Sequence, residues 1–347
     1  MYQFKNLYYL SVMLMTIFLV GCFQGEQALQ EIDLPPDQDN SNFEDNVELT
    51  TNSYETITRE LFLKDVNGFI VGQTFELPLP ISGAVAEQSL EYLIKGGPIT
   101  ELLPNGFSAV IPEDTEILGL NLQKNGTLII DLSEEFTNYQ PEDEIKILEA
   151  MTFTLTQFDN IEQIKIKING TMLDDMPVNG TPIAQGYSRS RGINVVQTDT
   201  IDLFDSKVVT IHYPTNYNHN RYYVPVTVYI NSASNTYENV VKMLIEGPQL
   251  NNFSTLDIFD PKTTLVNKPR VYDGVLQLEF NEFILDDIGQ GIISDEVIET
   301  LVRTLMEFPE VKAIQVNVNN VETIMNEQGE IYDQPVEMDS DSLSEKM

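Results

Sequence analysis

The chain has 347 residues, with 19 lysine and arginine side chains against 54 aspartate and glutamate side chains, so its formal charge at pH 7 is −35. This charge excludes a general nucleic-acid binder, because such proteins neutralise phosphates with clustered lysine and arginine. The hydrophobic content of 42% is enough for packed cores, and the length predicts two domains at about 150 residues each. The single cysteine, Cys22, excludes an intramolecular disulfide and a cysteine-based zinc cluster.

Residues 1–21 predict a lipoprotein signal peptide. Their apolar run covers residues 7–20, which is too short for a bilayer span of roughly 20 apolar residues. The run ends in Leu19-Val20-Gly21-Cys22, which resembles the bacterial lipobox. We therefore predict that Cys22 is lipidated and becomes the first residue of the mature protein. The alternative is a short membrane anchor with a buried, inert cysteine.

Residues 22–58 predict a disordered acidic linker. From residue 23 to residue 58 the chain has nine acidic residues, the pair Pro35-Pro36 and no lysine or arginine. Low hydrophobicity and like charges favour an extended spacer, and a flexible chain of this length spans roughly 30–35 Å. The acidic tail at residues 337–347 is interpreted in the same way.

An internal repeat follows the linker. The segment Leu-Ile-Lys-Gly-Gly-Pro at residues 93–98 recurs as Leu-Ile-Glu-Gly-Pro at residues 244–248. Further landmarks recur at an offset of 150, namely Leu155, Phe158, Ile164 and Asn169 with Leu305, Phe308, Ile314 and Asn319. Landmarks in the same order indicate a duplicated domain. We assign the first repeat to residues 59–183, a connector to residues 184–205 and the second repeat to residues 206–336.

Each repeat is predicted to open with a strand and a helix. The strands lie at residues 60–63 and 208–212, where β-branched and aromatic side chains alternate with polar ones. The helices end at Gly96-Gly97-Pro98 and at Gly247-Pro248, because glycine accepts the left-handed C-cap conformation and proline cannot continue the helix. These glycines close a helix, whereas a phosphate-binding loop opens one, so a helix end is favoured over a phosphate site.

A hairpin, a second helix and a closing strand complete each repeat. Asn-Gly and Asp-Gly turns are strong hairpin signals, and an acidic first turn suits the helix dipole. The predicted elements are hairpin strands at residues 116–122 and 127–132, turns at Asn125-Gly126 and Asp273-Gly274, helix starts at residues 142–144 and 294–296, and closing strands at residues 163–168 and 313–318. The order β-α-β-β-α-β, present twice, predicts an α+β fold of two small sandwiches. In each, two helices cover one face of a largely antiparallel sheet and leave the other face or an edge free for association.

The sequence predicts no catalytic or metal-binding residues. His212 and His219 lie at a strand end and in the loop after it, but a zinc site needs a third ligand and supporting partners. Asp174-Asp175 and Asp286-Asp287 lack the spacing of a calcium loop, so solvated loops are favoured. The sequence has no nucleophile elbow, phosphate loop or His-Glu-x-x-His motif. A pair of carboxylates of the glycosidase type stays open as an alternative.

Arg189 and Arg191 form the densest basic spot of the acidic chain. They lie in the connector, between Gly186 and Gly192. Two interpretations stay open, a docking point for an acidic partner and an ordinary solvated loop, and the second is favoured.

Several of these motifs together resemble the GerM family of lipoproteins of endospore-forming bacteria, which has tandem GerMN domains. They are the lipobox, Gly96-Gly97-Pro98, Leu-Leu-Pro-Asn-Gly-Phe at residues 102–107 and Phe-Thr-Asn-Tyr-Gln-Pro-Glu-Asp-Glu at residues 136–144. The resemblance covers almost everything after residue 58 and is strongest in the first repeat. The second repeat departs from it, with Gly247-Pro248 in place of the longer motif.

The resemblance implies a non-enzymatic sporulation and germination protein, without cofactors, whose domains are related in topology to ring-building motifs. It further implies a lipid anchor at Cys22 on the outer face of the cell membrane, on the mother-cell side of the spore envelope. The expected function is that of a scaffold or assembly factor for the channel complex between mother cell and forespore. The alternative is a peptidoglycan-binding or wall-modifying protein. Binding of a small molecule or metal and assembly into a homo-oligomer stay open.

Overall fold

The computed structural model describes residues 55–80, 84–196, 205–232, 236–248 and 255–338. Residues 53–347 form one compact unit. The predicted signal peptide, Cys22 and most of the acidic linker and tail therefore lie outside the described residues. The first strand begins at Thr56, inside the segment assigned to the linker, because the β-branched residues Thr56, Ile57 and Thr58 already pair with the next strand.

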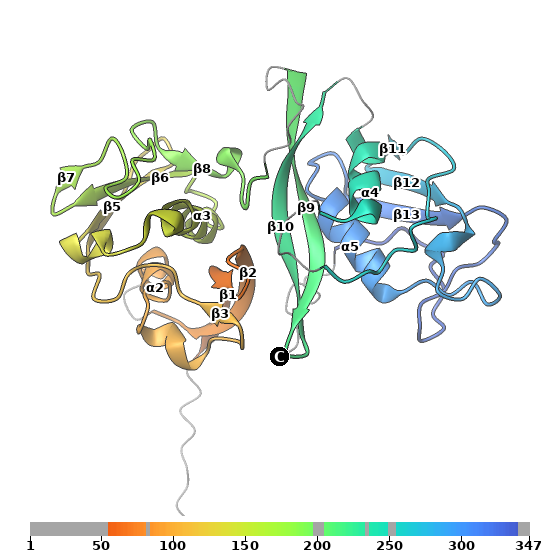
Figure 1. Ribbon diagram of the computed structural model, residues 1–347, viewed down its shortest axis with the longest axis horizontal. Helices are drawn as coiled ribbons and strands as arrows, with labels where there is room; N and C mark the ends of the chain where they lie inside the picture. The colour runs from red at the N-terminus through yellow and green to blue at the C-terminus, as the bar shows by residue number, and fades with distance from the viewer. Residues whose placement is uncertain (1–54, 81–83, 197–204, 233–235, 249–254, 339–347) are drawn as a thin grey trace, which may run out of the picture. The chain divides into compact units, whose positions relative to one another are not determined.

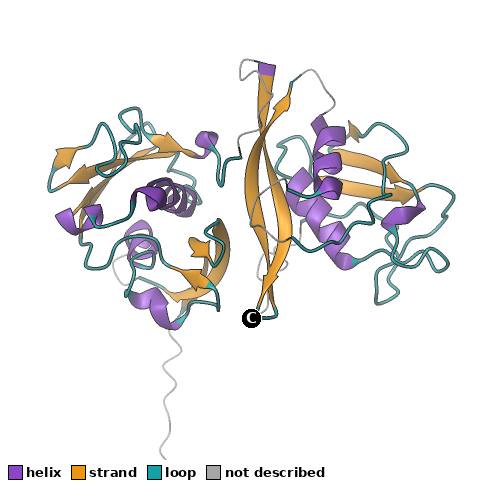
Figure 2. Cartoon of the chain, in the orientation of Figure 1, coloured by secondary structure: helices purple, strands orange, loops and turns teal. Residues whose placement is uncertain are grey.

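The first repeat is built from strands, two α-helices and short 3₁₀ helices (Figure 1, Figure 2). Its elements are β1 (Thr56–Asp65), β2 (Ile70–Pro78), α2 (Val85–Glu91), η1 (Pro98–Glu101), β3 (Phe107–Ser108), β4 (Ile117–Leu122), β5 (Thr127–Leu132), η2 (Glu134–Thr137), η3 (Pro141–Asp143), α3 (Glu144–Leu155), β6 (Gln163–Ile168), β7 (Thr171–Met172), β8 (Tyr187–Ser188) and η4 (Arg189–Arg191). The strands form two sheets with the orders β2-β1-β3 and β4-β5-β6-β7, and β8 pairs with β6.

The second repeat follows the same plan. Its elements are β9 (Ser206–Tyr217), β10 (Asn220–Asn231), α4 (Thr236–Glu246), β11 (Arg270–Tyr272), β12 (Val275–Phe280), η6 (Glu282–Ile284), α5 (Asp295–Leu305) and β13 (Ala313–Val318). The sheets have the orders β10-β9 and β11-β12-β13. The predicted α+β class and the duplication are thereby confirmed.

Each repeat opens with a hairpin where the sequence predicted one strand followed directly by a helix. Strand β2 pairs with β1 over the whole register from Thr56↔Pro78 to Lys64↔Ile70, and β10 pairs with β9 in the same manner. The Asp65 carboxylate closes the first hairpin by accepting from the backbone N–H groups of Asn67 at 2.9 Å and Phe69 at 2.7 Å. The structure therefore adds a second strand to the predicted order in both repeats.

The later sheet of each repeat is mixed, whereas the sequence predicted a largely antiparallel one. Strand β5 is antiparallel to β4 but parallel to β6, and β12 is parallel to β13. The reason is the helix between the paired strands, because a crossover by α3 or α5 returns the chain in the same direction.

Helix α3 lies between the two sheets of the first repeat (Figure 1). Ten of its twelve residues are buried, from Glu144 and Ile147 through Leu155. A helix covered on two sides needs apolar or satisfied polar side chains almost all round, which explains its weak amphipathic pattern. In the second repeat, α5 packs against β9 and β13.

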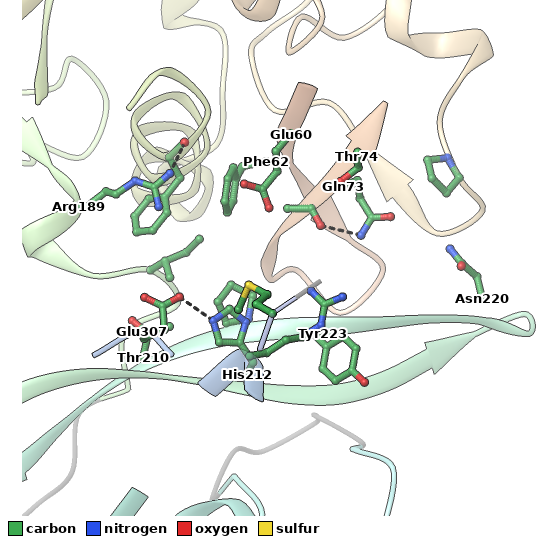
Figure 3. Close-up of a pocket in the computed structure, with 17 residues that line it drawn as sticks. Glu60, Phe62, Gln73, Thr74, Arg189, Thr210, His212, Asn220, Tyr223 and Glu307 are labelled. Atoms are coloured by element: carbon green, nitrogen blue, oxygen red, sulfur yellow. Dashed lines mark hydrogen bonds and ion pairs between the residues drawn. The ribbon is translucent and has the colours of Figure 1, made fainter. Parts of the chain in front are cut away.

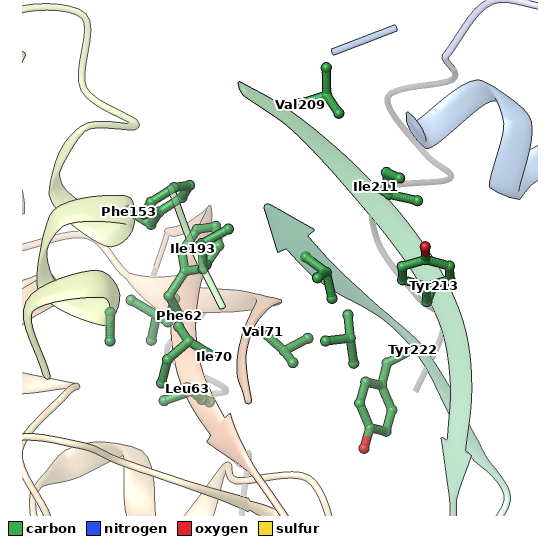
Figure 4. Packing of buried hydrophobic residues seen from close by; sticks show 14 of the residues in the cluster. Phe62, Leu63, Ile70, Val71, Phe153, Ile193, Val209, Ile211, Tyr213 and Tyr222 are labelled. Carbon is green, nitrogen blue, oxygen red and sulfur yellow. The ribbon is translucent and has the colours of Figure 1, made fainter. Parts of the chain in front are cut away.

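The opening hairpins of the two repeats cover each other. Strand β10 contacts β2, and Ile70 and Val71 of β2 are fully buried, as is Val224 of β10 (Figure 4). The ring of Tyr222 lies edge-on to Phe107 with 4.9 Å between the ring centroids, and its hydroxyl donates to Asp65 at 2.9 Å. The sheet face that the sequence left free for association is therefore covered by the other repeat.

No helix in the described ranges is long and apolar enough to cross a membrane.

Candidate functional site

A cavity of about 320 Å³ lies between the two repeats (Figure 3). Both repeats contribute charged and aromatic side chains to its wall. These include Glu60, Phe62, Phe153 and Arg189 on one side and Thr210, His212, Tyr223, Arg303 and Glu307 on the other. The cavity brings ionisable groups of opposite sign together from both repeats, and it is the candidate functional site.

Glu60 projects from β1 into this cavity. The side-chain amide of Gln157 holds its backbone, donating to the Glu60 carbonyl at 2.8 Å and accepting from its N–H at 3.4 Å. The carboxylate lies over Gly72, where an added Cβ would collide with it. Glu60 is exposed at the mouth of the cavity, and partial desolvation by the neighbouring protein raises the pKa of its carboxyl, although Arg189, His212 and Arg303 act in the opposite direction.

Arg189 is held by the C-terminal end of α3. Its guanidinium donates to the Thr156 hydroxyl at 2.7 Å and to the Phe153 carbonyl at 2.8 Å, and it stacks over the Phe153 ring at 4.5 Å. A cation at a helix C-terminus suits the helix dipole, and the ring face adds a cation–π contact. The sequence favoured a solvated loop here. Arg189 is exposed, as expected for a solvated loop, but its side chain is bound within the first repeat.

Arg191 has weaker contacts. Its guanidinium lies 5.0 Å from the centroid of the Tyr187 ring, and one donor reaches the Gly186 carbonyl at 3.4 Å. The two arginines thus belong to a folded segment that pairs β8 with β6.

His212 and Glu307 form a hydrogen-bonded pair in the cavity. The His212 Nε2 atom lies 3.0 Å from a carboxylate oxygen of Glu307, which follows α5. Burial alone would raise the pKa of Glu307, but the hydrogen bond and charge of His212 and the charge of Arg189 hold it below the usual value. The sequence singled out His212 but missed this partner.

His219 lies away from His212, at the tip of the β9–β10 hairpin. Asn218 has φ +50° and His219 has φ +67°, so both occupy the left-handed region that a two-residue hairpin turn requires. The two histidines therefore do not converge on one site. No group of three or more His, Cys, Asp or Glu side chains is placed to hold a metal within the described ranges. Asp287 instead accepts from Gln290 twice, in a local turn.

The cavity wall uses equivalent positions of the two repeats with different side chains. The N–H of Phe62 donates to Thr154 at 2.9 Å, and the N–H of His212 donates to Thr304 at 3.1 Å. These pairs are related by the offset of 150, and the same offset relates Gln157 to Glu307. The repeat was therefore a usable signal for the partner of His212, since it places Glu307 beside the strand.

Arg303 is also engaged within its own repeat. It forms an ion pair with Glu299 at 2.7 Å and stacks over the Tyr223 ring at 4.5 Å. The described residues that line the cavity include threonines but no serine or cysteine. The cavity thus gathers charges that are held by neighbouring groups, without a nucleophile beside the histidine.

Asn194 joins the repeats next to this cavity. Its side-chain oxygen accepts from the Ile70 N–H at 2.8 Å, and its amide nitrogen donates to the carbonyls of Ile70 at 2.7 Å and Pro225 at 2.8 Å. Its own N–H donates to Glu149 of α3 at 3.1 Å. One connector residue, at φ +48°, therefore links β2, β10 and α3. Sequence patterns gave no signal for it.

Glu149 is a buried titratable group of this junction. It is 2% exposed, and desolvation raises the pKa of its carboxyl to about 7, although the Asn194 N–H and Lys146 act in the opposite direction. The junction between the repeats therefore contains a group that titrates near neutral pH.

Comparisons with known proteins agree on one family. The model of the Germane family, described as sporulation and spore germination, matches residues 61–174 and 210–323, one segment in each repeat. The chain is 40% identical over 342 residues to the spore germination protein GerM of Bacillus subtilis (strain 168), covering 92% of both chains. Its structure is similar to that of the tandem GerMN domains of the sporulation protein GerM from Bacillus subtilis. That match has a TM-score of 0.72 and 42% identity, and it covers 82% of this chain and 97% of the other. The chain therefore belongs to the Germane family of sporulation and spore germination proteins.

Proposed function

We propose that this protein is a lipid-anchored, non-catalytic scaffold of the spore envelope. It would act as an assembly factor for the channel complex between mother cell and forespore. Membership of a sporulation and germination family supports the setting. The side chains of the cavity support the non-catalytic character, since each charged group except Glu60 is held by a neighbouring side chain or carbonyl.

The observation that carries the proposal is the joint packing of the two repeats. Their opening hairpins cover each other, and Asn194 and the Tyr222–Asp65 hydrogen bond tie the junction. A scaffold must hold two binding surfaces at a fixed separation, and buried hydrogen bonds between well-packed strands supply that rigidity. The outer strands of both repeats remain at sheet edges, where partner chains can add.

The proposed location follows from Cys22 and the acidic segment after it. Two acyl chains on a lipidated cysteine would anchor the protein to the outer face of the mother-cell membrane, at about 0.8 kcal/mol for each buried methylene. Residues 23–54 would then separate the folded unit from the lipid surface. Replacing Cys22 with serine should release the protein from washed membranes, and a variant that stays fully bound would contradict this location.

The scaffold function is tested by sedimentation of the full chain with detergent-solubilised channel proteins from sporulating cells. A defined heterocomplex or ring is expected. Titration with muropeptides is the matched experiment for the wall-binding alternative. A protein that stays monomeric, does not bind the channel proteins and binds muropeptides would overturn the scaffold proposal.

A further inference from the structure

A groove on the second repeat lies between the start of β9 and the edge strand β11. Lys207 and Val208 line one side, and Arg270 and Val271 line the other. The floor contains the rings of Tyr237 and Phe308, which meet edge-on with 5.1 Å between their centroids. The groove thus combines two strand edges with an aromatic floor, and it is separate from the cavity between the repeats.

The outer edge of β9 is accessible at Val208, beside this groove. On that edge the N–H of His212 donates to Thr304, and the Pro214 carbonyl accepts from Leu256. Because successive residues of a strand point their backbone groups to opposite sides, Thr210 and Val208 direct theirs to the same outer edge. Among the described residues, no backbone group is paired with this edge at Val208. A strand edge of this kind is a template for another extended chain.

The first repeat closes the equivalent edge with its own side chains. Gln157 pairs with the backbone of Glu60, whereas its counterpart Glu307 binds the His212 side chain and leaves the Thr210 position without an amide cap. Arg59 lies over the Phe158 ring at 5.4 Å. Its counterpart in β9 is Val209, so Phe308 is left to pack with Tyr237. The difference between two copies of one domain marks the groove as a specific feature of the second repeat.

The charges of the groove define its occupant. Lys207 and Arg270 are both exposed, in a chain with 19 basic against 54 acidic side chains. Among the described side chains that line the groove Glu310 is the one acidic group, and it accepts from the Tyr237 hydroxyl. Two exposed cations at opposite sides of an apolar floor complement acidic side chains on an extended segment.

We propose that this groove binds an extended acidic segment of a partner protein, which adds as a strand to the outer edge of β9. The backbone of Val208 would pair with the backbone of the segment. Apolar side chains of the segment would rest on Tyr237 and Phe308, while its carboxylates would meet Lys207 and Arg270. The inference rests on the proposed scaffold function in one respect, namely that the ligand is a protein.

The test uses the full chain and a fluorescent eight-residue peptide in which valine and glutamate alternate. Fluorescence anisotropy measures its dissociation constant. The double variant Lys207→Glu, Arg270→Glu should weaken binding by about tenfold or more, because both charge pairs become repulsive. Lys124→Glu, a single charge reversal of the same kind in the β4–β5 loop, is the control and should leave binding unchanged.

A second variant tests the strand pairing itself. Val208→Pro removes one outward N–H without touching the pairing of β9 with β10, since proline is tolerated at strand edges. Val208→Pro should weaken binding of the peptide by about tenfold. Thr58→Pro, at the equivalent place in β1, should leave its binding unchanged. The melting temperature of each variant separates misfolding from lost binding.

Three outcomes would overturn the proposal. One is equal binding of a peptide with lysine in place of glutamate, and another is unchanged binding by both groove variants. The third is binding that appears only after residues 23–54 are deleted, which would make the acidic linker of this chain the occupant. If the peptide does not bind, the heterocomplex test of the scaffold function is unaffected. The groove proposal and the scaffold proposal can therefore be refuted independently.

Discussion

Glu144 shows how a single residue fastens a loop to the buried helix α3. Its carboxylate is fully buried and accepts from the Tyr139 hydroxyl at 2.9 Å and from the Asn179 N–H at 2.7 Å. Thr181 donates with both its N–H and its hydroxyl, at 2.9 and 2.6 Å. Burial alone would raise the pKa of Glu144, but the hydrogen bonds from Thr181, Asn179 and Tyr139 outweigh it and hold the pKa below the usual value.

We expect Glu144→Gln to lower the free energy of unfolding by about 1–3 kcal/mol at pH 7, because the amide cannot accept from all of these donors. The lowered pKa makes the ionised form stabilising above the unfolded-state pKa, and this contribution is lost as the pH falls through the folded-state value. Urea denaturation between pH 7 and acid pH checks both effects. The exposed neighbour Glu142→Gln is the control, and an equal effect of the two variants would contradict the assignment.

Glu149 is expected to behave in the opposite direction. Its pKa is raised from 4.5 to about 7, so the folded protein loses stability as the pH rises through this interval, by on the order of 3 kcal/mol at most. Glu149→Gln still accepts from Asn194 but carries no charge. The variant should therefore match the wild type near pH 5 and exceed it above pH 7 in the same denaturation series. A constant difference across the pH range would refute the raised pKa.

At the scale of elements, long segments with a clear pattern were predictable. The β4–β5 hairpin, the starts of α3 and α5 and the closing strands β6 and β13 lie where the turn glycines, the acidic first turns and the alternating β-branched residues predicted them. Strand β2 was missed because Gly72 and Gln73 interrupt its apolar pattern. Strand β10 contains Pro225, and proline is disfavoured in central strands because it has no N–H. Here the nitrogen of Pro225 faces the outer edge of β10, where the Pro225 carbonyl accepts from Asn194.

The turn between β9 and β10 carries a further prediction at this scale. His219 occupies the left-handed region at φ +67°, where a residue without Cβ is less strained. His219→Gly should raise the free energy of unfolding by about 0.5–1 kcal/mol, and His219→Val should lower it by about 1–2 kcal/mol. Thermal unfolding of the two variants measures the difference. Equal unfolding free energies for the two variants would show that the turn adopts another conformation in solution.

Most of the candidate site was not predictable from sequence. His212 stood out as a rare residue type, but Glu60, Arg189 and Glu307 come from three distant segments that meet only when the hairpins of the two repeats pack together. Asn194 lies in a connector without hydrophobic periodicity. Its hydrogen bonds to both repeats depend on a backbone conformation that no local sequence pattern predicts.

At the scale of the whole molecule, Asn194 ties the junction between the repeats. Asn194→Ala removes three side-chain hydrogen bonds and leaves the Ile70 and Pro225 groups unpaired. We expect a loss of about 2–4 kcal/mol in unfolding free energy, since unpaired buried groups cost about 1–3 kcal/mol each and some will find water. Hydrogen exchange at β2 and β10 should increase. Asn179→Ala, on the surface of the first repeat, is the control and should change neither quantity.

The central claim is that the two repeats act as one body in capturing envelope proteins. The most direct measurement compares wild type and Asn194→Ala by sedimentation with the same solubilised channel proteins, at a temperature where both remain folded. We predict a defined heterocomplex for the wild type and a clear loss of that complex for the variant, because its repeats no longer hold a fixed separation. A wild type that captures none of these proteins, or a variant that captures them equally well, would contradict the account.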